Sequence, residues 1–116
     1  MKRTLTALTV AATMFASSAS AFDPDDLQKL KDTGRCGECD LGGANLADAD
    51  MTRAILAGAN LAGSDLRGAD LHSANLTDAH LEGANLRDAI INYAMMKGTT
   101  LCNTTMPYGS VIYSGC

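Results

Sequence analysis

Residues 59–88 read ANLAGSDLRGADLHSANLTDAHLEGANLRD, and this stretch decides the fold. An aliphatic residue returns at every fifth position, and an alanine or a serine stands two positions before each of them. The same register extends in both directions, from Cys39 to Tyr113, as fifteen groups of five with Leu, Ile, Met or Val at every centre. Two positions after the centre, Gly, Asp or Asn fills ten of the fifteen places, and these residues tolerate turn conformations.

A period of five fits neither a helix nor a strand. At about 100° per residue, successive leucines would move around the whole circumference of a helix, and in a strand of period two they would alternate between faces. A single core forms only if the chain bends after every five residues and stacks on itself at about 4.8 Å, the spacing of hydrogen-bonded strands. The pattern predicts an all-β solenoid with the aliphatic centres inside, and it leaves three-sided and four-sided coils open.

The A(D/N)LXX form of the repeat, as in ANLAD, ADLHS and ANLTD, resembles the pentapeptide-repeat family. The resemblance covers residues 36–116 and implies a right-handed, four-sided β-helix with four repeats per coil, which gives about four coils here. The two borders, CGECDL and LCNTTMPYGSVIYSGC, are similar to those of exported bacterial members of unknown function. In the second border, Tyr108 stands where this resemblance implies an aspartate.

Residues 1–21 have the pattern of a secretory signal peptide: a basic start, an apolar stretch and a small-residue cleavage site before Phe22. We expect their removal and export of the chain, to the periplasm in preference to the thylakoid lumen or the extracellular space. Residues 22–35 are predicted to form a short helix that covers the first coil. Asp23 is its expected N-cap residue, Pro24 its first residue and Gly34 its stop.

The processed chain, residues 22–116, is acidic. Seven Lys and Arg face thirteen Asp and Glu, so its net charge is −6. An acidic surface disfavours nucleic acid and anionic membranes as partners. The processed chain has no second long apolar stretch, so we expect no membrane insertion. We therefore expect a protein partner, and the sequence leaves homo-oligomers open.

The four cysteines allow three pairings. In the four-sided coil that the resemblance implies, Cys36 and Cys116 lie four coils apart, about 19 Å, which is beyond the reach of a disulfide. The same coil thus favours bonds between Cys36 and Cys39 and between Cys102 and Cys116, which would fasten the C-terminal end. Reduced or metal-bound thiols are the alternative.

Residues twenty apart share a face in such a coil, so the outward columns can be assigned. One side carries Asp50 and Asp70, with His72 and Ser73 beside them, and then Tyr93 with Tyr113 stacked on it. Neither a hydrolase triad nor a calcium site is expected there, because a convex side offers no pocket and no wrapping loop. We expect no catalytic residue, metal or cofactor. A possible interaction surface is predicted from four apolar residues: Ile90, Tyr93, Ile112 and Tyr113.

The predicted function is a non-catalytic structural or protein-interaction module of the bacterial cell envelope. The alternative is an inhibitor that mimics nucleic acid and binds a type II topoisomerase, as some pentapeptide-repeat proteins do. Export argues against this alternative, because topoisomerases act in the cytoplasm, and four coils are short for such mimicry.

Overall fold

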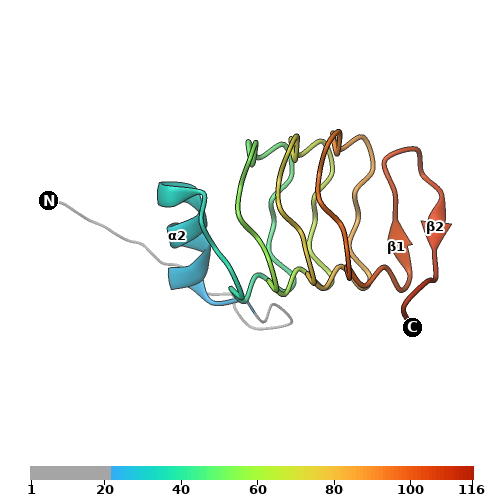
Figure 1. The fold of residues 1–116 in the computed structure, drawn as a ribbon, viewed down its shortest axis with the longest axis horizontal. Coiled ribbons are helices and arrows are strands. Elements are labelled where there is room, and N and C mark those ends of the chain that lie inside the picture. Colours follow the sequence, from blue (N-terminus) through green and yellow to red (C-terminus); the bar gives the residue numbers. More distant parts are fainter. Residues whose placement is uncertain (1–21) are drawn as a thin grey trace, which may run out of the picture.

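The structure is a computed structural model that describes residues 22–116. The predicted signal peptide lies outside these residues. The described chain forms a helix, a stack of coils and a terminal hairpin, in that order (Figure 1). Within it, no helix has the length and apolar character of a membrane span.

The coils form because residues twenty apart pair in parallel. Eleven single-residue bridges follow this rule, from Arg35 with Ile55 to Asn85 with Thr105. Each coil therefore takes four pentapeptides, which decides between the three-sided and four-sided arrangements that the period of five left open. The bridged residues extend from Arg35 to Thr105, a separation of 70 residues, so the regular part has about three and a half coils.

The core is a set of stacked columns of aliphatic side chains. Nine leucines at repeat centres have no measurable exposure or almost none: Leu41, Leu46, Leu56, Leu61, Leu66, Leu71, Leu76, Leu81 and Leu86. The small residues two positions earlier, such as Ala59 and Ala74, are also fully buried, which lets adjacent sides of the coil approach closely. The predicted inward direction of the repeat centres is confirmed over this range.

Helix α2 (Pro24–Thr33) lies against the first coil at the N-terminal end (Figure 1). Asp23 is its N-cap residue, and the Asp23 carboxylate accepts a hydrogen bond from Asp25 N; Gly34 follows in the left-handed conformation, with φ 68°. These are the residues predicted for the two ends of the helix. Leu30 packs into the core, and the Asp26 carboxylate accepts a hydrogen bond from the first-coil Asp40 N at 2.8 Å.

The C-terminal end differs from the prediction. Strands β1 (Thr104–Thr105) and β2 (Val111–Ile112) form an antiparallel hairpin in which Thr104 pairs with Ile112. A continued repeat would need Tyr108 at the left-handed corner, but Gly109 takes that conformation instead, with φ 88°. The chain therefore reverses after Pro107, and Val111, expected inside, is 43 % exposed. This hairpin replaces about the second half of the last of the predicted four coils.

Both predicted disulfides are present. Cys36 is bonded to Cys39 beside α2, and Cys102 is bonded to Cys116, which ties the end of the hairpin to the last coil. The first pair is buried, whereas Cys116 is exposed rather than in the inward position that its register predicted.

Candidate interaction surface

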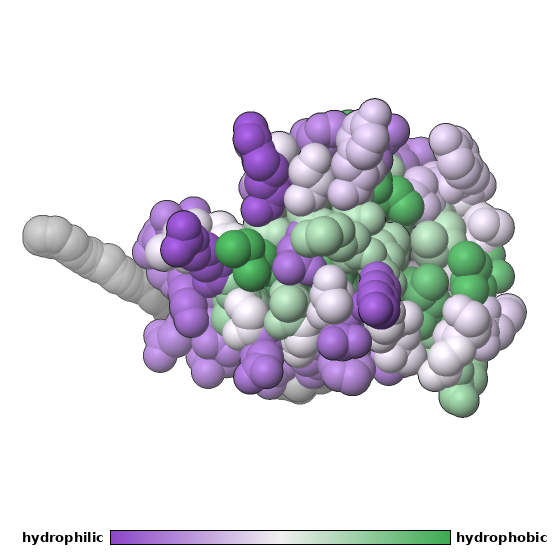
Figure 2. All heavy atoms as spheres, in the orientation of Figure 1, coloured by the Kyte–Doolittle hydropathy of each residue, from purple (hydrophilic) through white to green (hydrophobic). Residues whose placement is uncertain are grey.

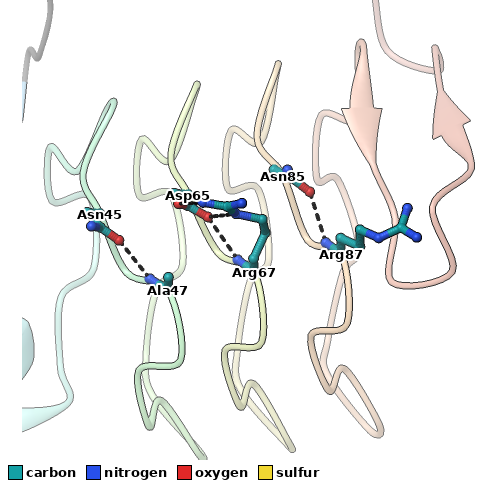
Figure 3. Close-up of polar contacts among 6 residues, drawn as sticks. All are labelled: Asn45, Ala47, Asp65, Arg67, Asn85 and Arg87. Atoms are coloured by element: carbon teal, nitrogen blue, oxygen red, sulfur yellow. Dashed lines mark hydrogen bonds and ion pairs between the residues drawn. The ribbon is translucent and has the colours of Figure 1, made fainter.

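The repeat follows two structural rules that identify its unusual positions. The first concerns backbone hydrogen bonds. In residues 74–78, four of the five N–H groups donate to backbone carbonyls, and the fifth, Thr77 N, donates to the Asn75 side chain at 3.0 Å. Figure 3 shows the same contact in the column of Asn45, Asp65 and Asn85. The Asn or Asp at the second position of a pentapeptide thus satisfies a donor inside the turn.

Some pentapeptides lack this side-chain acceptor. From residue 39 to residue 103 their second positions are Ile55, His80, Ile90, Met95 and Thr100. Sequence reasoning noted the Asn and Asp preference but missed its cause, because the contact becomes clear only when every N–H group of the turn has been assigned a partner.

The second rule concerns the corners. Every fifth residue from Gly43 to Asn103 has a left-handed backbone, with φ between 57° and 75°. Gly, Asp and Asn fill ten of these thirteen places, as their conformational tolerance favours. The three exceptions are Arg53, Ser73 and Tyr93, which are twenty residues apart and therefore occupy one corner of successive coils. We call this column the Arg53–Tyr93 corner.

Side chains at this corner contact each other. The rings of His72 and Tyr93 meet edge to face, with centroids 5.5 Å apart and an interplanar angle of 85°. Tyr93 is 82 % exposed, and Ile90, which pairs with Asp70 in the coil below, is 46 % exposed. The corner thus presents an aromatic and an aliphatic side chain to solvent next to an imidazole.

Polar groups beside the corner are engaged in local turns. The Asp50 carboxylate accepts hydrogen bonds from the Thr52 hydroxyl at 2.7 Å and from Thr52 N, and these bonds lower the pKa of Asp50. The Asp70 carboxylate accepts from His72 N at 3.0 Å, which is a backbone contact and does not orient the imidazole as a triad would. Among residues 22–116, no three His, Cys, Asp or Glu side chains are grouped as a metal site requires.

The structure divides the four residues of the predicted surface into two pairs. Ile90 and Tyr93 remain together in the pentapeptide of residues 89–93, with Tyr93 at the Arg53–Tyr93 corner and Ile90 in the column of Asp70. Ile112 and Tyr113 follow the hairpin instead: Ile112 pairs with Thr104, and the carbonyl of the next residue, Ser114, accepts from Leu101 N. The predicted stacking of Tyr113 on Tyr93 is therefore wrong, because the twenty-residue register stops before the hairpin. Sequence reasoning also missed Tyr108, which is fully exposed.

A small hollow lies between α2 and the first coil. It has a volume of about 100 Å³ and is lined mainly by apolar residues, among them Leu30, Leu46 and Met51, with Asp50 and Lys31 at its polar part. Pockets for organic ligands are typically several hundred Å³. This hollow is therefore too small to hold such a ligand.

Two equivalent arginines behave differently (Figure 3). Arg67 folds back on Asp65 of its own pentapeptide, with guanidinium-to-carboxylate distances of 2.8 and 2.7 Å, and these hydrogen bonds lower the pKa of Asp65 and raise that of Arg67. Arg87 has the uncharged Asn85 in the place of Asp65, so it forms no equivalent ion pair. Its side chain extends towards the hairpin turn, where its Nη1 atom lies so close to Gly109 that a Cβ atom there would meet it. Arg87 thus packs against the hairpin.

Comparison with known proteins gives a family match over most of the described chain. The model described as "Pentapeptide repeats" matches residues 35–72 and 69–106, with eight copies of the repeat. Among curated proteins, none shows significant similarity to the chain.

Solved structures that resemble the chain are also pentapeptide repeat proteins. One is from the thylakoid lumen of Arabidopsis thaliana: it is 31 % identical with a TM-score of 0.62, and the match covers 71 % of this chain and 60 % of that protein. Another is HetL, involved in heterocyst differentiation regulation in the cyanobacterium Nostoc sp. strain PCC 7120. It is 27 % identical with a TM-score of 0.49, and the match covers 67 % of this chain and 51 % of HetL. The chain thus spans between half and two thirds of the length of these structures.

Proposed function

The chain belongs to the pentapeptide-repeat family, and from that premise we propose that it is a non-catalytic protein-interaction module whose contact surface is centred on residues 89–93. One observation carries the proposal. Between residues 39 and 103, this is the only pentapeptide that departs from both rules of the repeat, with Ile90 at its second position and Tyr93 at its fifth.

Both departures oppose stability. Ile90 cannot supply the oxygen that satisfies an N–H group inside the turn, and a net hydrogen bond of this kind is worth about 1 kcal/mol. Tyr93 holds a left-handed backbone that costs roughly 1–2 kcal/mol for residues other than Gly, Asn or Asp. Positions that break local rules without a gain in packing are expected at functional sites. Ile90 and Tyr93 fit this description because both are largely exposed.

The chemistry of the corner suits a protein partner. Tyrosine and arginine are over-represented among the residues that dominate binding energy at protein interfaces, and Tyr93 and Arg53 share the corner column. The flat neighbouring sides supply backbone-supported polar groups for a rim around this centre. A partner with an apolar contact and hydrogen-bond acceptors would complement such a surface.

The cellular setting is part of the same proposal. We place the protein outside the cytoplasm, in the bacterial cell envelope and most simply in the periplasm. Two disulfides support this location, since such bonds persist in oxidising compartments, and the similar thylakoid-lumen protein is consistent with it. In this proposal the coil is right-handed and α2 serves as its N-terminal cap, for which the buried Leu30 gives support.

The test separates a stability role from a binding role. Changing Ile90→Asn and Tyr93→Asn together restores the repeat rules, so we expect an unchanged or higher melting temperature. A photo-reactive amino acid placed at the exposed Asn92 should cross-link a partner in the native host, and the double variant should abolish that adduct.

The matched control is Ile55→Asn, which restores the same rule at a site with similar exposure (41 %) away from residues 89–93. It should leave the adduct intact, and a photo-reactive group at Gln28 on α2 should give none. If the double variant still forms the adduct, or if the probe at Gln28 gives as much adduct as the probe at Asn92, residues 89–93 are not the contact surface.

A further inference from the structure

The C-terminal hairpin leaves one edge of strand β2 without a partner in the described residues. Met106 N donates to the Ser110 carbonyl at 2.8 Å, so Met106 and Ser110 form a hydrogen-bonded pair of the ladder. Bonded and non-bonded pairs alternate in antiparallel ladders, and Thr104 with Ile112 is the next bonded pair. Val111 and Tyr113 therefore direct their N–H and C=O groups away from β1.

The hairpin around this edge, residues 104–113, carries no charged side chain of its own, and Arg87 packs against its turn. Val111 is 43 % exposed, Tyr113 66 % and Tyr108 100 %. All thirteen Asp and Glu residues lie at or before Asp88, and Lys97 is the only charged side chain after it. Figure 2 shows the resulting contrast, with purple spheres concentrated around the helix and pale to green spheres at the hairpin end.

Natural proteins usually protect such an edge. The common devices are a lysine, a proline or a bulge on the exposed strand, or a covering element. In β2 there is no charged residue, and Pro107 lies in the turn rather than on the edge. At the opposite end of the solenoid, α2 covers the first coil. Among residues 22–116, β2 is therefore a strand whose outer edge has no covering element.

We propose that this edge is an interface between two copies of the chain, in which the two β2 strands pair antiparallel about a two-fold axis at Ile112. This register places Val111 opposite Tyr113 of the second copy on both sides of the axis. All outward N–H and C=O groups of these two residues are then used, in four hydrogen bonds. Val111 and Tyr113 lie on the same face of β2, so each valine meets a tyrosine, a favourable cross-strand combination.

Charge and size both favour a second copy as the occupant. Two acidic chains repel each other, and the hairpin is a segment through which they can meet with no carboxylate side chain in the paired strands. The cross-section of the molecule is about 27 × 23 Å, so an end-to-end contact buries at most about 600 Å² per copy. A total of at most about 1,200 Å² does not exceed the low end for stable complexes, which predicts a weak, reversible dimer.

The assembly should stop at two copies. A two-fold contact uses the same patch on both molecules and leaves no second copy of that patch free. Since α2 covers the other end, the described chain offers no matching strand for growth into a filament.

The dimer is tested by sedimentation velocity of the purified protein from about 10 μM to about 1 mM. We expect a monomer–dimer equilibrium in this range. Val111→Lys should weaken it at least about ten-fold, because it places an ammonium group against Tyr113 of the second copy and puts two like charges on the same face of the paired strands. Val111→Pro, which removes only an outward N–H group, should weaken it without disturbing the β1–β2 pairing. Ile55→Lys is the matched control, since Ile55 is equally exposed but lies far from the hairpin, and it should have no effect.

Hydrogen exchange gives a second measurement on the unmodified chain. The amides of Val111 and Tyr113 should become protected as the concentration rises, while that of Ile112 stays unchanged. A monomer at every concentration would overturn the proposal, as would a dimer that Val111→Lys leaves intact. Neither result bears on the contact surface at residues 89–93, which the cross-linking experiment tests separately.

Discussion

At the N-terminal end of the solenoid a ten-residue helix inserts Leu30 into the core, whereas at the C-terminal end a short hairpin lies over the last coil with Val111 and Tyr113 exposed. The side chains of Asp23 and Asp26 accept hydrogen bonds from backbone N–H groups and so secure the first arrangement, whereas the Cys102–Cys116 disulfide secures the second. One end is thus closed by hydrophobic burial and the other by a covalent bond. Because the disulfide holds the hairpin in place, this end does not need a covering element that buries apolar side chains. The outer edge of β2 therefore stays exposed.

Of the changes that test this difference between the two ends, removing the C-terminal disulfide should lower the free energy of unfolding most. The double change Cys102→Ser and Cys116→Ser opens a loop with a sequence separation of 14 residues, which predicts a loss of about 3 kcal/mol in the free energy of unfolding. Native-state hydrogen exchange should show lost protection in residues 99–116 and retained protection in the regular coils. A loss spread evenly over all coils would contradict the local role of this bond.

Leu30→Ala should weaken the N-terminal end by a smaller amount. Leu30 is only 5 % exposed, and truncating a buried leucine at a site that can partly collapse costs about 2 kcal/mol. Val111→Ala is the counterpart at the other end and should cost less than about 0.5 kcal/mol, because Val111 is exposed. Urea unfolding of both variants measures the difference. Equal losses would mean that the hairpin closes its end by burial as well.

Arg67→Gln should have the smallest effect and provides a reference away from both ends. Hydrogen bonds from Arg67 lower the pKa of Asp65 below its ordinary value, so the pair stabilises the fold at neutral pH. This contribution is lost as the pH falls through the lowered pKa. Since the Arg67 side chain is 59 % exposed and that of Asp65 29 %, the melting temperatures of variant and parent should differ slightly at pH 7 and converge as the pH falls through the lowered pKa of Asp65. A difference that persists in acid would assign it to packing rather than charge.

The regular coils could be predicted from the sequence because their determinants are local. Leu61 and Ala59 are buried as their places in the repeat predict, and Asp23 and Gly34 flank the helix as their capping tendencies predict. The two disulfides were expected from the spacing of the four-sided coil that the family resemblance implies. Of the four residues in the predicted interaction surface, Ile90 and Tyr93 lie in one pentapeptide of the coil, whereas Ile112 and Tyr113 follow the hairpin, which the repeat pattern did not predict.

The sequence by itself determined which side chains point inward, because a chain that bends every five residues repeats the same backbone conformation, and each pentapeptide contains all the residues that this conformation needs. Only the tertiary structure decided how many pentapeptides make a coil and where the coils stop. The first depends on hydrogen bonds between residues twenty apart. The second depends on a competition at one corner, where Gly109 adopts the left-handed conformation in place of Tyr108 and turns the chain back. Neither outcome follows from the five-residue pattern, because both depend on contacts between different coils.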